Sequence, residues 1–188
     1  RIHFAFRRDW VAIGEMELLA QKSDGAFEMA RIFSDKKDYE KGFLVQERIE
    51  GGLGLGAYIL KLRAEGRTDP HLEKFLGFVR LNEPWFAREM AIRSGGAGIR
   101  QRTYVDRLEG VAPIESYFGL RINPRDLKLS PEQLAISNPE LARLVFQKRL
   151  QIGVSPEGRI YIDTFLGFDI TNENVRVLPE GRIVVIDP

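Results

Sequence analysis

Two β-branched, apolar runs near the C-terminus constrain the fold of this chain most strongly. They occupy residues 174–178 and 182–186, and Pro179-Glu180-Gly181 lies between them. Short runs of this kind joined by a turn that contains glycine predict an antiparallel β-hairpin. Because a hairpin brings its two open ends together, we expect Asn174 and Asp187 to lie close together in space.

Three oxygen-bearing side chains therefore gather at the base of the predicted hairpin. Asn174 and Asp187 stand at its two ends, and Asp169 lies one short loop before it. Mg²⁺ prefers hard oxygen ligands and commonly shares them with phosphate groups. The sequence thus predicts a magnesium site at this point. The alternative is that Asp169 and Asn174 cap a turn and that Asp187 only ends a strand.

The order of these residues resembles the catalytic core of the protein kinase-like superfamily. Residues 169–174 fit the pattern D-x-x-x-x-N, and Ile186-Asp187-Pro188 stands where D-F-G would stand. An I-D-P ending is more similar to small-molecule and atypical kinases than to eukaryotic protein kinases. The resemblance implies that Asp169 is the catalytic group that orients the acceptor hydroxyl, and that Asn174 and Asp187 hold the metal. It also implies ATP and Mg²⁺ as cofactors.

The N-terminal part of the chain predicts a series of short elements. They are, in order, a strand at 1–8, a helix at 14–21, a strand at 26–33, a charged loop at 35–41, a strand at 43–49 and a helix at 53–64. The helix at 14–21 and the elements that follow it resemble helix C, strands four and five, the hinge and the next helix of a kinase. The implied fold is α+β and protein kinase-like. It has a reduced N-lobe and hinge at 1–52, and a mainly helical C-lobe at 53–188 that ends in the hairpin.

Three residues of this region receive a nucleotide-binding role from the resemblance. Glu15 would be the helix-C glutamate that pairs with the phosphate-binding lysine. Glu47 and Ile49 would belong to the hinge at 47–51, whose backbone hydrogen-bonds adenine. The alternatives are a solvated helix residue for Glu15 and a buried strand with a turn for 43–52.

The sequence also departs from the family pattern. Too few residues precede Glu15 for a glycine-rich loop and its lysine strand, so Arg7, Arg8 or a segment upstream would have to supply the cation. Gly167 stands at the position of the usual catalytic-loop histidine, and Thr171 at that of the usual lysine. These departures keep a second hypothesis open, a non-catalytic pseudokinase or interaction module.

The middle of the chain, at about 67–135, is predicted to be an unusual insertion. Asp69-Pro70 and Glu83-Pro84 each predict the start of an amphipathic helix, and residues 105–130 are predicted to be rich in loops. Asn138-Pro139 predicts the start of a helix at 141–150.

A glycine-rich break at 94–98 is flanked by three arginines, Arg93, Arg100 and Arg102. Such a loop is able to hold a phosphate or a nucleic-acid backbone, and the alternative is a solvated loop. A third hypothesis for the chain is therefore a nucleic-acid-associated protein.

A second hairpin-like segment at 156–163 nearly repeats the text of the C-terminal one. It places Asp163 where the later segment has Asp187. We assign the metal to Asp187, because only that aspartate has D-x-x-x-x-N upstream.

The composition excludes several other kinds of chemistry. The chain has 188 residues, a net charge of +1 and no cysteine, so it has no disulfide and no thiolate metal site. The near-zero charge makes nucleic acid an unlikely partner, and no apolar run has bilayer length. His3 and His71 are isolated. We expect a trimmed, cytoplasmic protein that binds a nucleotide and transfers a phosphoryl group to an unknown protein or small-molecule acceptor.

Overall fold

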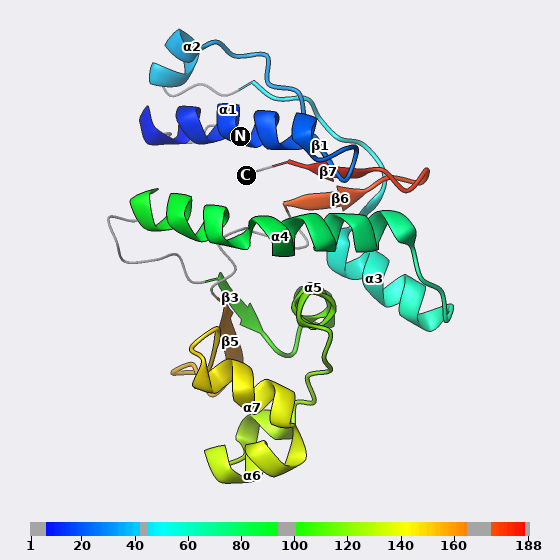
Figure 1. The fold of residues 1–188 in the computed structure, drawn as a ribbon, viewed down its shortest axis with the longest axis vertical. Helices are drawn as coiled ribbons and strands as arrows, with labels where there is room; N and C mark the ends of the chain where they lie inside the picture. Colours follow the sequence, from blue (N-terminus) through cyan, green and yellow to red (C-terminus); the bar gives the residue numbers. More distant parts are fainter. Residues whose placement is uncertain (1–6, 42–44, 94–100, 165–173, 187–188) are drawn as a thin grey trace.

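The computed structural model describes residues 7–41, 45–93, 101–164 and 174–186 (Figure 1). They form a mixed α+β structure, as expected. The helices are α1 (Arg7–Lys22), α2 (Lys36–Glu40), α3 (Leu55–Ala64), α4 (Pro70–Arg93), α5 (Leu108–Phe118), the 3₁₀ turn η1 (Asp126–Lys128), α6 (Pro131–Ser137) and α7 (Pro139–Phe146). The strands are β1 (Glu28–Met29), β2 (Leu53–Gly54), β3 (Gln101–Tyr104), β4 (Leu150–Val154), β5 (Ile160–Thr164), β6 (Val175–Val177) and β7 (Ile183–Val185).

The predicted C-terminal hairpin is confirmed as β6 and β7. These strands are antiparallel, and Val175 lies opposite Val185. Gly181 has φ +85°, a conformation that costs glycine little, and its N–H donates to Leu178 O at 2.9 Å. The hairpin forms the centre of a sheet with the order β1-β7-β6-β2.

Helices α1 and α4 lie on either side of this first sheet (Figure 1). All three residues of β7 are apolar and buried, so both faces of this strand are covered, whereas β6 buries Val175 and Val177 on one face and has the half-buried Arg176 on the other. The buried residues of this first hydrophobic cluster come from α1, α3, α4, α5 and the hairpin, and Phe75 at its centre is 0% exposed. The cluster therefore contains residues from both sides of the boundary predicted between an N-lobe at 1–52 and a C-lobe at 53–188. That boundary stays a prediction.

A second hydrophobic cluster lies around an antiparallel sheet with the order β3-β5-β4. Its buried residues belong to 105–162 and include Leu141, Leu150 and Ile162. Helix α5 connects the two clusters. Its residues Ala112 and Tyr117 belong to the first cluster, and Val111 and Ile114 belong to the second.

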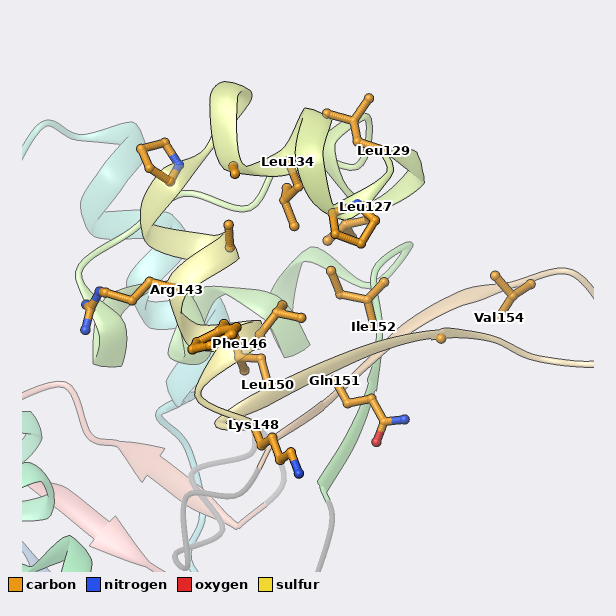
Figure 2. A pocket seen from close by; sticks show the side chains of 16 residues that line it. Leu127, Leu129, Leu134, Arg143, Phe146, Lys148, Leu150, Gln151, Ile152 and Val154 are labelled. Carbon is orange, nitrogen blue, oxygen red and sulfur yellow. The ribbon is translucent and has the colours of Figure 1, made fainter.

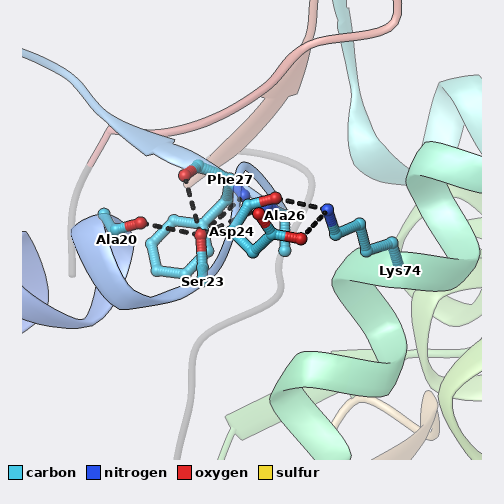
Figure 3. A network of polar contacts seen from close by, with 6 residues as sticks. All are labelled: Ala20, Ser23, Asp24, Ala26, Phe27 and Lys74. Atoms are coloured by element: carbon cyan, nitrogen blue, oxygen red, sulfur yellow. Dashed lines mark hydrogen bonds and ion pairs between the residues drawn. The ribbon is translucent and has the colours of Figure 1, made fainter.

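The end of α1 is attached to α4 by a small polar network (Figure 3). Ser23 Oγ donates to Ala20 O at 2.7 Å and closes the last turn of the helix. Asp24 then adopts φ +52°, and its carboxylate accepts from Lys74 Nζ at 3.0 Å. A turn at Asp24-Gly25 thus follows α1, and the carboxylate of Asp24 contacts a helix residue 50 positions away in the sequence.

Two prolines lie inside helices, contrary to the sequence prediction. Asp69 does cap α4, since its Oδ1 accepts from His71 N at 2.8 Å, but α4 continues through Pro84 instead of restarting there. Pro113 is buried inside α5, in a segment predicted to be loop. Proline removes one intrahelical hydrogen bond, and burial of the apolar residues around it offsets that loss.

Three further predictions at the N-terminal end were wrong in part. Arg7 and Arg8 begin α1 and belong to no strand. Residues 36–40 form the short helix α2 where a loop was expected. Of the strand predicted at 43–49, the described residues retain one isolated bridge, Ile32 to Gln46.

Candidate functional site

Of the two predicted metal ligands, Asn174 and Asp187, only Asn174 belongs to the part of the chain that is described. Ile186 N donates to Asn174 O at 2.8 Å, so Asn174 closes the open end of the hairpin opposite Ile186. The position of Asn174 follows directly from the register of β6 and β7, and its side chain is half-buried. Asp187 comes next after Ile186 in the sequence, but Asp187 and the predicted catalytic Asp169 lie outside the described residues.

The segment predicted to be the hinge lies beside this hairpin base. Strand β1 runs parallel to β7, and Ala30 N donates to Val185 O at 2.9 Å. The chain then pairs through the Ile32–Gln46 bridge, and the Gln46 Nε2 group donates to Ile186 O. The side chain of Gln46, the residue just before the predicted hinge at 47–51, therefore contacts the residue opposite Asn174, across 140 positions of sequence.

The two predicted hinge residues differ in what their backbones do. Glu47 N donates to Arg31 O at 2.7 Å, and the Glu47 carboxylate accepts from Arg31 N at 3.2 Å. Ile49 is half-buried, and no described residue hydrogen-bonds its backbone N–H or C=O. Among the described residues, the backbone N–H of Glu47 has a partner inside the protein and that of Ile49 has none.

Glu15 lies on α1, next to the buried Met16, and is itself half-buried. Within the described ranges no cation pairs with its carboxylate. Arg7 and Arg8 belong to the same helix, two turns or more before Glu15, outside the i+3 and i+4 spacings at which helix residues pair. The helix alone therefore brings neither arginine to Glu15.

The glycine cluster after the predicted hinge has a structural role. Gly51 and Gly52 have φ values of +76° and +71°. A Cβ atom on Gly52 would lie 2.6 Å from Val177 O, so only glycine permits this close approach of the chain to β6. The turn leads Leu53 into β2, and α3 begins at Leu55, close to the start of the helix predicted at 53–64.

Arg102, one of the three arginines that flank the glycine-rich break, pairs with the carboxylate of Asp163. Its guanidinium donates two hydrogen bonds of 2.9 Å to Asp163 and lies 3.7 Å above the ring of Tyr161. Asp163 is 1% exposed, and the hydrogen bonds that Arg102 donates to this carboxylate raise the pKa of Arg102 above its usual range. The pairing favours a structural role for Asp163, and the assignment of the metal to Asp187 stays a prediction. Arg100 and the side chain of Arg93 are outside the described residues.

A buried polar network that the sequence analysis did not identify connects α4, α5 and the start of β4. The Glu83 carboxylate accepts from the Tyr117 hydroxyl and, at 2.7 Å, from Arg149 Nη2. Burial and the hydrogen bond to Glu83 raise the pKa of Tyr117 above its usual range. On α3, burial and a hydrogen bond to Asp69 raise the pKa of Tyr58 to about 12. The amphipathic pattern of the segment that forms α4 predicted burial, whereas residues 105–130 were expected to be rich in loops, and nothing local indicated which charges would pair.

The described residues contain no cluster of three His, Asp or Glu side chains that would hold a metal ion by itself. The predicted site depends on Asn174 together with residues beyond the described ranges. None of the described helices is both long and apolar enough to span a bilayer.

In comparisons with known proteins, no protein family, curated protein or solved structure matches this chain. The described residues define the class as a mixed α+β protein with a hairpin-centred sheet and a second, antiparallel sheet.

Proposed function

We propose that this chain is an atypical kinase-like domain that binds ATP with Mg²⁺ and transfers a phosphoryl group to a hydroxyl of a protein or small molecule. The observation that carries the proposal is the contact of Gln46 with Ile186 O, opposite Asn174. This contact supports the proposal because Gln46 directly precedes the segment at 47–51 that we propose to bind adenine, and Ile186 directly precedes the proposed metal ligand Asp187 in the sequence. Phosphoryl transfer needs these two functions side by side, since the enzyme mainly positions the phosphates and neutralises their charge.

Each residue has a distinct part in this proposal. The backbone of Ile49, to which no described residue hydrogen-bonds, binds the adenine edge. The half-buried Asn174 provides one oxygen ligand for the metal, and Asp187 provides another. Asp169 orients the acceptor hydroxyl. Bound Mg²⁺ supplies charge neutralisation at the phosphates. Glu15 pairs with a phosphate-binding cation that the described residues do not supply.

The first test is thermal unfolding with ATP, in the presence and absence of Mg²⁺. A ligand that binds only the folded state stabilises it by about 2.7 kcal/mol at a concentration 100 times its Kd. We expect a Mg²⁺-dependent rise in melting temperature for the wild type. Asp187→Asn and Asn174→Ala should remove that rise.

The second hairpin offers a matched control, Asp163→Asn. Asp163 occupies the equivalent place in a nearly identical sequence, but its carboxylate pairs with Arg102. We expect this variant to melt at a lower temperature than the wild type and still to respond to ATP with Mg²⁺. No response of the wild type to saturating nucleotide, or an equal loss in Asp163→Asn and Asp187→Asn, would contradict the proposal.

A second candidate, a nucleotide-binding pseudokinase, is favoured by Gly167 and Thr171 in place of the usual histidine and lysine. The melting experiment does not separate it from an active enzyme. Transfer of labelled phosphate from ATP to a hydroxyl-bearing acceptor does, because a pseudokinase would bind the nucleotide and transfer nothing.

A further inference from the structure

The second sheet leaves strand β4 at its edge, and an apolar groove runs along that edge (Figure 2). The groove has a volume of about 1010 Å³ and lies between β4 and the helices α6 and α7. Its walls include Leu127, Leu134, Ala142, Phe146, Ile152 and Val154. A groove bounded by a strand edge on one side and by helices on the other has room for an extended chain.

The hydrogen-bond pattern of the β4–β5 hairpin shows which backbone groups face the groove edge. Ser155 N donates to Arg159 O at 2.8 Å, so this pair is hydrogen-bonded. Bonded and non-bonded pairs alternate along an antiparallel ladder, and the next pair, Val154 with Ile160, is therefore non-bonded. Ile160 O accepts from Val105 on the β3 side, at 3.1 Å, which confirms the assignment independently.

The same alternation makes Ile152 with Ile162 a non-bonded pair. The N–H and C=O groups of Ile152 and Val154 consequently point away from β5, toward the free edge of the sheet. In the described part of the chain no residue pairs with them. This edge presents the donors and acceptors that an added strand would use.

Large apolar side chains are exposed beside this edge. Phe146 is 88% exposed and Val154 is 63% exposed, although Phe146 belongs to α7 and Val154 to β4. Figure 2 shows Ile152 and Val154 on the side of β4 that faces the helices and Gln151 on the other side. Exposed apolar groups gathered around a groove mark interaction surfaces, and aromatic residues contribute most to such contacts.

The charge around the groove has one sign. Arg143 and Lys148 are among the lining residues, and no acidic residue is. Arg143 pairs with Glu140, with 2.8 Å between Nη2 and Oε2, whereas no described residue pairs with the Lys148 ammonium. Figure 2 shows the Lys148 side chain on the same side of the chain as Gln151, away from α6 and α7, so Lys148 is complementary to a carboxylate on that face of an added strand.

We propose that β4 binds an extended peptide segment of another protein as an added strand. The alternate apolar side chains of this segment fill the groove under α6 and α7, and an acidic residue lies beside Lys148. A helical partner has no backbone groups to offer Ile152 and Val154, since a helix uses them internally. A second copy of this chain would bring the same cationic rim against Lys148. The proposal does not depend on nucleotide binding.

Selection of random dodecapeptides on the purified protein tests this directly, with Val154→Pro as the blocking variant. Proline at 154 removes the N–H that points to the free edge and leaves the β4–β5 ladder intact, because edge strands accept proline at such positions. Val154→Thr is the matched control, since it keeps both the N–H and a β-branched side chain. Circular dichroism melting curves show whether each variant is folded.

We expect the wild type and Val154→Thr to enrich peptides with apolar residues at alternate positions and an acidic residue near one end. Loss of one backbone hydrogen bond and the steric block should weaken these peptides about tenfold or more on Val154→Pro. Lys148→Glu should remove the acidic preference but keep the alternation. If Val154→Pro fails to fold, Phe146→Ser provides the second test, because Phe146 is exposed and its loss should weaken the same peptides.

Several results would overturn the proposal. Peptides with apolar residues three and four positions apart that bind Val154→Pro as tightly as the wild type would show that the groove takes a helix. Dimerisation of the wild type in light scattering, abolished by Val154→Pro, would show that a second copy occupies the edge. Absence of any enrichment over an unrelated protein would show that the edge binds no peptide.

Discussion

The substitution Gly56→Ala tests the packing of α3 against α5. These two helices approach each other closely at Gly56, where a side chain would meet the backbone of Glu109. A Cβ atom built on Gly56 would lie 2.6 Å from the carbonyl carbon of Glu109 and 3.0 Å from its Cα, and closer still to its oxygen. These are backbone atoms, so no side-chain rotation relieves the overlap. The helices would have to move apart.

Gly56 is buried and packs against the backbone of α5 at Glu109, one helical turn before Pro113. Because glycine has no side chain, it permits the short distance between α3 and α5.

The expected cost follows from two opposing effects. Overpacking a buried contact destabilises proteins by about 1–3 kcal/mol, and a rigid backbone neighbour places this site at the upper end. Replacing glycine by alanine in a helix returns about 1 kcal/mol. We therefore expect Gly56→Ala to lower the free energy of unfolding by about 2 kcal/mol or more.

Urea unfolding of Gly56→Ala and Gly77→Ala provides a matched comparison. Gly77 lies inside α4, and a Cβ atom there would meet nothing within 4 Å. This second variant should gain about 1 kcal/mol from helix propensity alone. Equal stabilities of the two variants would refute the inferred contact between Gly56 and Glu109.

Two further predictions concern pH and backbone conformation. The pKa of Tyr117 is raised by burial and by Glu83, and the folded state therefore holds the phenolic proton more strongly than the unfolded chain. Its contribution is complete below about pH 10 and is lost above it, so urea midpoints should fall more steeply there for the wild type than for Tyr117→Phe. Lys148 ends α7 with φ +57°, and Arg149 N donates to Leu144 O at 3.0 Å in the manner of a Schellman cap. Lys148→Gly should raise the free energy of unfolding by about 1 kcal/mol, measured with urea, whereas a gain of the same size in Lys148→Ala would contradict this explanation.

Features decided by a few neighbouring residues could be predicted from the sequence. The turn at 179–181 between two β-branched runs determined the hairpin and, through its register, the place of Asn174 opposite Ile186. Asp69 was identified as the cap of α4 for the same reason, since a short polar side chain before a helix bonds the first free N–H groups. The predicted roles of Asp169 and Asp187 rest on sequence spacing and stay predictions.

Features decided by distant residues appeared only in the tertiary structure. Pro84 and Pro113 predicted breaks locally, yet burial of the apolar residues on either side keeps α4 and α5 continuous. Asp163 and Asp187 stand in nearly the same local sequence, and the pairing of β3 with β5 brings Arg102 to Asp163 across 61 positions. Local patterns determine which residues turn, cap and alternate, whereas the choice of partners depends on which surfaces the whole chain buries together.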